Sequence, residues 1–341
     1  MSFLSEIVES KSISIVGLEK NTGKTECLNY ILRNLPQSLR VAVTSVGIDG
    51  ETVDQVTKTS KPQIKLKEGI IFSTSEYYYN RRRIVSEIID ISNSGSALGR
   101  IVSARALGLG NLIVSGPSSV MELRRWSARM KELGAELVII DGALSRLSIA
   151  SAGLSEAMVL TTGAAVTPDI NRLVRKTKFV KQLIGLDLTE GEELRRHLEV
   201  IDSGVWGIDE NDGLHKLDIA SSLLPVVLKP DFNKGCRRIF VSGALTDGFL
   251  KQITERMKKE ERFEIIIKDF TRVFADEQVC RGFLNKGGVL SVAGKSRLLA
   301  VCVNPTSPQG YRLDSDLLCS RMREELEVPV YDVVKGKDTI L

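Results

Sequence analysis

The chain has 341 residues, of which 43% are hydrophobic and 26% charged, and its formal net charge is +4. This length predicts two domains, whereas the small net charge gives no reason by itself to expect a nucleic-acid partner. No stretch approaches the ~20 consecutive apolar residues of a membrane span. Residues 1–12 are polar and lack the apolar core of a signal peptide. We therefore expect a cytoplasmic protein without a membrane partner.

The cysteines are scattered along the chain, and no two of them have Cys-x-x-Cys spacing. With only two histidines in addition, a disulfide framework or a zinc site is not expected. Buried or half-buried thiols are the favoured interpretation. Cys27 falls near the start of a predicted helix, where either a lowered thiol pKa or plain core packing is an interpretation, and packing is favoured.

Residues 17–25, Gly-Leu-Glu-Lys-Asn-Thr-Gly-Lys-Thr, are the most informative stretch of the chain. A short apolar run at residues 13–16 precedes them, and a helical pattern over residues 26–35 follows. This context is typical of a phosphate-binding loop, because loop N–H groups and the helix N-terminus together form an anion cradle. We expect Lys24 to reach the terminal phosphates of a nucleotide and the Thr25 hydroxyl to ligate Mg²⁺.

The residues expected to bind the nucleotide are consecutive in the loop and the first helical positions: Glu19, Lys20, Asn21, Thr22, Gly23, Lys24 and Thr25. The loop departs from the common spacing, since Gly17 lies one residue early and Leu18 stands where the first glycine is expected. An ordinary strand–turn–helix with a chance Gly-Lys-Thr is the alternative to a nucleotide site.

A strand predicted over residues 39–46 leads into Gly-Ile-Asp-Gly-Glu at residues 47–51. Asp49 thus lies just past the carboxyl end of a strand, where ligands collect in open α/β sheets. In an NTPase a carboxylate there holds Mg²⁺ through water or orients the attacking water. A simple turn is the alternative. Residues 51–67 are interpreted as a loop, either a nucleotide-ordered switch or a plain surface connection.

A short strand is expected over residues 69–74, and Ser75 and Glu76 are expected to begin a helix that continues through Ile91 on three- and four-residue apolar spacing. Three tyrosines at 77–79 and three arginines at 81–83 lie on it. Stacking on nucleic acid is one interpretation. A solvated or partner-binding face is favoured, because a run of charges usually marks one.

Strands over residues 100–104 and 111–115 precede a helix that ends near Leu133 and is capped by Ser118 or Ser119. The next strand has four apolar residues, 137–140, and ends in Asp141-Gly142. This is the pattern of a Walker-B-like carboxylate that binds Mg²⁺, although an Asp that merely ends a strand is the alternative.

The predicted metal ligands are Thr25, Asp49 and Asp141, and the predicted catalytic residues are Lys24, Asp49 and Asp141. The Asn-Lys-x-Asp pattern of guanine-reading GTPases is absent from the sequence. We therefore expect the cofactors to be ATP and Mg²⁺.

A strand over residues 157–162 and a helix over 167–184 complete a nucleotide-binding domain at residues 1–185. Residues 186–236 are predicted to form a β-rich connector, because short apolar pieces alternate with turns. A second alternation of strands and helices predicts a smaller α/β domain over residues 237–341. The expected fold class is α/β: a three-layer P-loop NTPase domain with a largely parallel sheet, followed by a second α/β domain.

Four stretches, 16–25, 46–51, 115–118 and 140–146, carry a resemblance that spans residues 12–167. They look like the P-loop subunit of the reactivase for cobalamin-dependent amino-acid aminomutases, of the lysine 5,6-aminomutase kind. The resemblance implies an ATPase that works with a second, mismatch-repair-like ATPase subunit. Together the two would drive a damaged cobalamin off the mutase so that intact adenosylcobalamin can load.

Carried over by position, Lys24 and Thr25 would bind phosphate and Mg²⁺, while Asp49 and Asp141 would serve the metal and the water. More broadly, the layout resembles the branch of P-loop NTPases that includes nitrogenase iron protein and dethiobiotin synthetase. Many members of that branch have a second lysine where this chain has Glu19. A dimer-bridging lysine is therefore not expected at this position.

Three functions follow as hypotheses. The first is an ATP-hydrolysing chaperone that reactivates an aminomutase in amino-acid fermentation, with the second subunit and the mutase as partners. The second is an ATP-dependent small-molecule kinase or ligase, in which the second domain holds the substrate. The third is a nucleotide-binding scaffold without catalysis. An oligomer is compatible with each of them.

Overall fold

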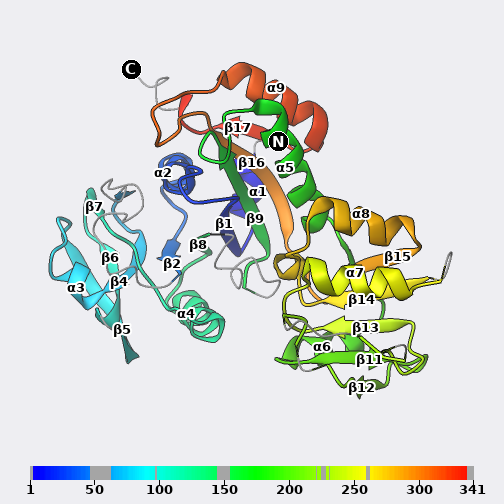
Figure 1. The fold of residues 1–341 in the computed structure, drawn as a ribbon. Helices are drawn as coiled ribbons and strands as arrows, with labels where there is room; N and C mark the ends of the chain where they lie inside the picture. The colour runs from blue at the N-terminus through cyan, green and yellow to red at the C-terminus, as the bar shows by residue number, and fades with distance from the viewer. Residues whose placement is uncertain are drawn as a thin grey trace. The chain divides into compact units, whose positions relative to one another are not determined.

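The computed structural model describes residues 3–46, 63–96, 98–143, 154–219, 221–223, 228–229, 231–258 and 262–335 (Figure 1). The chain divides into two compact units. The first contains Met1–Ala150, Leu154–Lys178 and Ser296–Leu341, and the second contains Ser151–Gly153 and Phe179–Lys295. The second unit is therefore inserted into the chain of the first.

The first unit is built on a nine-stranded sheet with the order β17-β16-β9-β1-β8-β2-β4-β6-β5. Its strands are β1 (Ser12–Gly17), β2 (Val41–Ser45), β4 (Ile71–Ser75), β5 (Ser86–Ser96), β6 (Gly99–Ala106), β8 (Leu137–Ala143), β9 (Ala157–Gly163), β16 (Arg297–Asn304) and β17 (Val330–Asp332). All neighbouring pairs from β17 to β4 are parallel, whereas β6 and β5 pair antiparallel at one edge. A separate antiparallel pair is formed by β3 (Ile64–Leu66) and β7 (Gly110–Leu112).

The described helices of this unit are α1 (Phe3–Glu9), α2 (Lys24–Asn34), α3 (Glu76–Tyr79), α4 (Val120–Glu132) and α9 (Ser315–Leu326). Helix α5 (Ile170–Ile184) begins in the first unit and continues into the second. Ser119 caps α4 as the sequence predicts, because its side chain accepts a hydrogen bond from the Glu122 N–H.

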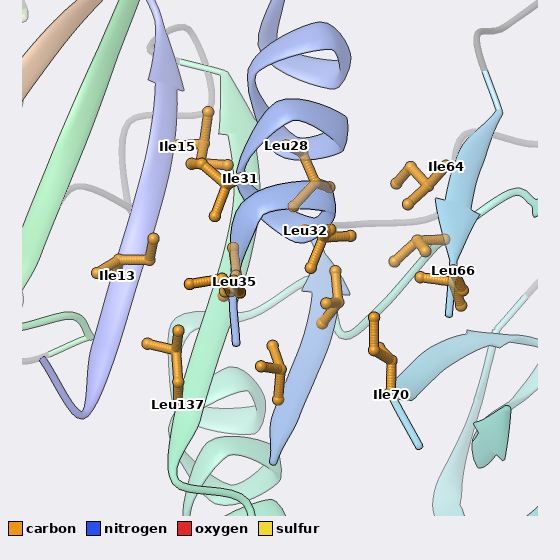
Figure 2. Close-up of a cluster of buried hydrophobic side chains, with 14 of the residues drawn as sticks. Ile13, Ile15, Leu28, Ile31, Leu32, Leu35, Ile64, Leu66, Ile70 and Leu137 are labelled. Atoms are coloured by element: carbon orange, nitrogen blue, oxygen red, sulfur yellow. The ribbon is translucent and has the colours of Figure 1, made fainter. Parts of the chain in front are cut away.

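Two apolar clusters show that helices cover both faces of the nine-stranded sheet. On one face, Ile13 and Ile15 of β1 and Leu137 of β8 share a cluster with Leu28 and Ile31 of α2 (Figure 2). On the other face, Val138 and Ile140 of β8 pack with Leu123, Trp126 and Met130 of α4. Successive strand residues point to opposite faces, so central parallel strands covered on both sides read as continuous apolar runs. This layering confirms the α/β part of the predicted fold.

The second unit has a six-stranded sheet with the order β10-β15-β14-β13-β11-β12. Its strands are β10 (Asp187–Leu188), β11 (Val205–Ile208), β12 (Leu214–Lys216), β13 (Arg238–Val241), β14 (Phe263–Ile267) and β15 (Gly288–Val292). Its helical elements are α6 (Glu192–Val200), α7 (Asp247–Arg256), α8 (Glu277–Asn285) and the 3₁₀ turn η2 (Phe270–Arg272). Helices α7 and α8 share one apolar cluster on one face of this sheet. Helix α6 packs in a second cluster on the other face.

The observed units differ from the predicted domain boundaries at 185 and 236. Strands β11 and β12, predicted to lie in a separate connector at residues 186–236, belong to the six-stranded sheet. Strands β16 and β17, predicted to lie in the last domain at residues 237–341, return to the nine-stranded sheet. The reason is that β16 pairs with β9 from Arg297 to Asn304, and a buried apolar strand carries no local signal of its partner.

The helix predicted from Ser75 through Ile91 is also wrong. Ser75 does cap α3, but this helix ends at Tyr79 and the following chain forms strand β5. Isoleucine favours strands because its branched side chain fits a pleated surface. Ile88 and Ile91 lie opposite Ala104 and Val102 of β6. Cross-strand pairing therefore makes this segment a strand, although the spacing of its isoleucines also fits a helix.

All five cysteines are buried free thiols, which confirms the interpretation made from their spacing. Among the described residues, no helix combines the length and the apolar character that crossing a membrane requires.

Candidate functional site

The carboxyl ends of β1 and β9 form a topological switch point in the nine-stranded sheet. These strands are parallel neighbours, with Gly17 opposite Thr161. After β1 the next strand of the sheet, β2, lies toward one edge, whereas β16, the next strand of this sheet after β9, lies toward the opposite edge. In open α/β sheets the crevice at such a point is where ligands bind. The loop of residues 18–23 lies at this position, since it joins β1 to α2.

Threonine hydroxyls and main-chain bonds hold this loop in shape. The Leu18 N–H donates to the Thr161 carbonyl at 2.8 Å. The Thr22 hydroxyl donates to the Glu19 carbonyl at 3.0 Å, and it therefore accepts from the Thr161 hydroxyl at 3.1 Å. Thr22 and Thr161 are both almost fully buried. Thr161 of β9 thus holds the loop at two points, Leu18 and Thr22.

These contacts account for the extra residue in the loop. Leu18 is buried and its N–H extends the ladder between β1 and β9 by one residue. Gly17 nevertheless meets the steric demand of a first loop glycine. A Cβ on Gly17 would lie 2.6 Å from Thr22 Oγ1 and 3.0 Å from Lys24 Nζ. The Lys24 amine therefore folds back toward the start of the loop.

Gly23 ends the loop in a conformation that glycine adopts most easily. Its φ angle is 89°, in the left-handed region. A Cβ at this position would also lie 2.8 Å from the Cβ of Asn304, the last residue of β16. The Gly23 carbonyl accepts from the Cys27 N–H at 2.9 Å and begins the hydrogen-bond ladder of α2. The N-terminus of α2 consequently faces the carboxyl edge of the sheet.

Asp141 lies on β8, the strand on the other side of β1, with Ile15 opposite it. Its Oδ1 atom is buried and accepts no hydrogen bond from any described residue. Burial raises the pKa of the Asp141 carboxyl above its usual range, and the positive charge of Lys24 offsets part of this rise. A buried carboxylate oxygen without a protein donor is uncommon. Such an oxygen is available to a cation as a ligand.

The structure thus brings Lys24 and Asp141, two of the predicted catalytic residues, close enough for their charges to interact. Thr25 is half-buried in the first turn of α2. Asp49, the third predicted ligand, lies outside the described residues, as do residues 144–153 after β8. Within the described part of the chain, no group of three His, Cys, Asp or Glu side chains is placed to hold a metal. An ion here would need the Thr25 hydroxyl and phosphate oxygens besides Asp141.

Cys27 in the second turn of α2 is a core residue. Its thiol interacts with Cys302 of β16, and this contact together with burial raises the pKa of the Cys27 thiol well above its ordinary value. The lowered pKa considered from the sequence is therefore wrong. The helix N-terminus would favour a thiolate, but contact with a second thiol and full desolvation outweigh it.

Three residues of the site were not expected from the sequence. Thr161 anchors the loop, Asn304 packs against Gly23, and Lys176 of α5 forms an ion pair with Glu19. Asn304 ends β16 and Thr161 lies near the carboxyl end of β9, and this position beside the loop was the available signal. No local pattern marks Lys176, because its contact spans 157 residues of sequence.

No family model matches the chain, and neither the curated proteins nor the solved structures contain a significant match.

Proposed function

We propose that the loop of residues 17–25 binds a nucleoside triphosphate with Mg²⁺ and that the protein hydrolyses it, as a P-loop NTPase. The observation that carries this proposal is the buried Oδ1 of Asp141, which lies near Lys24 and accepts no hydrogen bond from the residues that the structure describes. An isolated buried charge is costly unless a partner arrives. Its place on β8, the neighbour of the strand that leads into a glycine-bounded loop and a helix N-terminus, favours a phosphate-bound cation as that partner.

Each residue has a separate role in this proposal. Loop N–H groups and the N-terminus of α2 bind the phosphates, and Lys24 neutralises the terminal ones. Thr25 and Asp141 would hold Mg²⁺, which would supply positive charge to stabilise the charge that develops on the phosphates. Asp49 is proposed from the sequence alone to orient the attacking water. Gly17 and Gly23 leave room for the Lys24 amine and the Asn304 side chain.

We propose ATP as the nucleotide, because the sequence lacks the guanine-reading pattern. The proposed role is reactivation of a cobalamin-dependent aminomutase together with a second ATPase subunit, on the resemblance of residues 12–167. Such a role requires that the ATP and ADP states bind the client with different affinities, since otherwise hydrolysis shifts no equilibrium.

The first experiment measures ATP binding and phosphate release by the purified protein with Mg²⁺. Lys24→Ala should weaken ATP binding by at least about tenfold and reduce hydrolysis further, because Lys24 is the cation nearest the terminal phosphates. Lys178→Ala is a matched control, since Lys178 lies on α5 and forms an ion pair with Glu325. Equal affinity in wild type and Lys24→Ala would reject the loop as a nucleotide site.

A second experiment tests the role. Phosphate release is measured with and without lysine 5,6-aminomutase that carries a damaged cobalamin, and cobalamin release is followed by absorbance. Stimulated turnover with cobalamin release would support reactivation. Turnover that depends on a small acceptor would instead support a kinase or ligase, and binding without any turnover would support a scaffold.

A further inference from the structure

Glu19 is the only acidic residue among residues 17–25. Its backbone is fixed, because its carbonyl accepts from the Thr22 hydroxyl and the preceding residue is bonded to Thr161. The carboxylate is therefore held beside the loop. A bound polyphosphate would meet a like charge there, and like charges a few ångströms apart repel each other measurably even near a protein surface.

The structure gives this carboxylate a cation. Lys176 Nζ donates to Glu19 Oε1 at 2.5 Å and forms an ion pair with it, so the bond is charge-assisted. The two side chains are 48% and 41% exposed, so solvent screens the pair in part. Lys176 lies on α5, the helix that follows β9, and β9 is also the strand that holds the loop.

We propose that Lys176 belongs to the polyphosphate-binding site and acts through Glu19. The amine neutralises the one carboxylate of the loop, and it keeps that side chain directed toward α5. Lys176 is thus a positioning residue that touches Glu19. The inference rests on the proposed function, since it needs an anionic ligand in the loop.

The same helix offers a matched control. Lys178 Nζ donates to Glu325 Oε2 at 2.6 Å, and these side chains are 41% and 46% exposed. Glu325 belongs to α9 and is not a residue of the loop. Lys178→Ala therefore removes the same charge and a comparable ion pair, but it leaves no uncompensated carboxylate in the phosphate loop.

The experiment measures the Kd of ATP and of ADP by calorimetry for the full-length protein. Lys176→Ala should weaken ATP binding about fivefold at low salt and weaken ADP binding less, because ADP carries less charge. Glu19→Gln combined with Lys176→Ala should restore the affinity to within about twofold of wild type. The loss should shrink at high salt, since screening reduces repulsion between exposed charges.

Lys178→Ala should leave both dissociation constants unchanged. Equal effects of Lys176→Ala and Lys178→Ala would overturn the proposal, because a general loss of positive charge would then explain both. A double variant as weak as Lys176→Ala alone would also overturn it, since Lys176 would not act through Glu19. Wild-type protein that binds no ATP would reject the proposed function itself, which separates that failure from the other two.

Discussion

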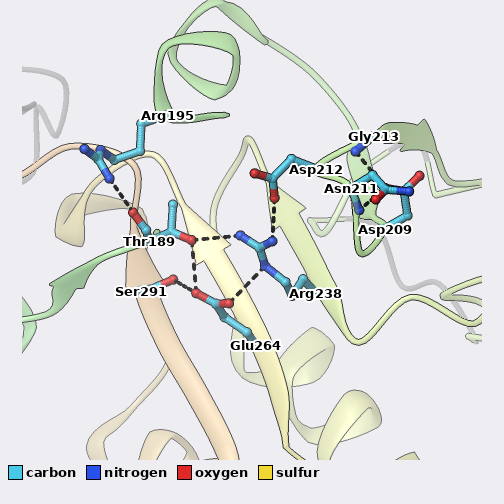
Figure 3. A network of polar contacts seen from close by, with 9 residues as sticks. All are labelled: Thr189, Arg195, Asp209, Asn211, Asp212, Gly213, Arg238, Glu264 and Ser291. Atoms are coloured by element: carbon cyan, nitrogen blue, oxygen red, sulfur yellow. Dashed lines mark hydrogen bonds and ion pairs between the residues drawn. The ribbon is translucent and has the colours of Figure 1, made fainter. Parts of the chain in front are cut away.

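Two half-buried carboxylates, one in each unit, lie in opposite situations. Glu264 of the six-stranded sheet accepts from the Ser291 hydroxyl at 2.5 Å, the Thr189 hydroxyl at 3.2 Å and Arg238 Nε at 3.2 Å (Figure 3). Asp141 of the nine-stranded sheet has a buried oxygen with no donor among the described residues. Protein donors satisfy the first carboxylate, whereas Oδ1 of the second meets none in the described part of the chain.

The difference separates a carboxylate with a structural role from one for which we propose a functional role. Protein donors surround Glu264, and Arg238 also donates to Asp212 at 2.7 Å, so this network needs no ligand. Asp141 raises the free energy of the folded state, and such a residue is retained where function requires it. The carboxyl edge near β1 and β8 is therefore the better site for chemistry.

The largest expected effect is on catalysis. Asp141→Asn removes the charge that we propose to hold the metal, so phosphate release at saturating ATP and Mg²⁺ should fall by on the order of 10²-fold or more. Glu264→Gln keeps the shape of a half-buried carboxylate in the other unit and should leave the rate within about twofold. Equal losses in both variants would contradict the distinction drawn between the two carboxylates.

The next effect is on stability. Glu264→Ala removes the acceptor of Arg238 Nε and of the Ser291 and Thr189 hydroxyls, and it should destabilise the second unit by about 2 kcal/mol. The chain has two tryptophans, Trp126 in the first unit and Trp206 in the second. Urea unfolding followed by Trp206 fluorescence in a Trp126→Phe background reports on the second unit. Exposed Glu210 gives the control, since Glu210→Ala should change stability by less than about 0.5 kcal/mol.

A smaller effect should depend on pH in the ligand-free protein. The pKa of Asp141 is higher in the folded than in the unfolded state. As pH rises above the ordinary carboxyl pKa, the unfolded state therefore releases a proton that the folded state still holds. Stability therefore falls over the pH range between the two pKa values and stays reduced above it. Asp141→Asn lacks this loss and should be about 1 kcal/mol more stable at neutral pH.

This gain should vanish under acid conditions, where Asp141 is protonated in both states. Trp126 fluorescence in a Trp206→Phe background measures the unfolding free energy of the first unit at each pH. A variant that is less stable than its parent at neutral pH would show that Asp141 is satisfied after all.

The smallest effect concerns the support of the loop. Thr161→Val removes the hydroxyl that donates to Thr22, and ATP affinity should fall about threefold because the loop loses one buried hydrogen bond. Thr162→Val is the control, since the neighbouring hydroxyl pairs with Thr177 of α5 at 3.2 Å. Calorimetry should detect a change in the first variant only, and a reversed order would show that β9 does not shape the loop through Thr161.

Much of the local structure could be predicted from the sequence. The apolar run before Gly17 and the Lys-Thr that follows predict a strand, a loop and a helix in the order observed. The run before Asp141 likewise predicts β8. These patterns are local, because a central parallel strand must be apolar on both faces and a helix begins where N–H groups find acceptors.

The errors arose where distant residues decided the outcome. Residues 86–91 carry isoleucines whose spacing fits a helix, yet pairing with β6 makes them a strand. Residues 297–304 look like any buried strand, and only their pairing with β9 returns them to the first sheet. The unusual spacing of the loop could not be explained from the sequence either. It follows from the hydrogen bond of the Leu18 N–H to Thr161, a residue that is distant in the sequence.

The sequence by itself determined the order of most strands and helices and the glycine-bounded loop. It also singled out Lys24 and Asp141 as candidate site residues. Only the tertiary structure decided that β8 and β9 flank β1, that a buried oxygen of Asp141 meets no donor among the described residues and that Lys176 neutralises Glu19. The physical reason is range. Propensity and periodicity act over a few residues, whereas burial and charge pairing depend on which distant segments the fold brings together.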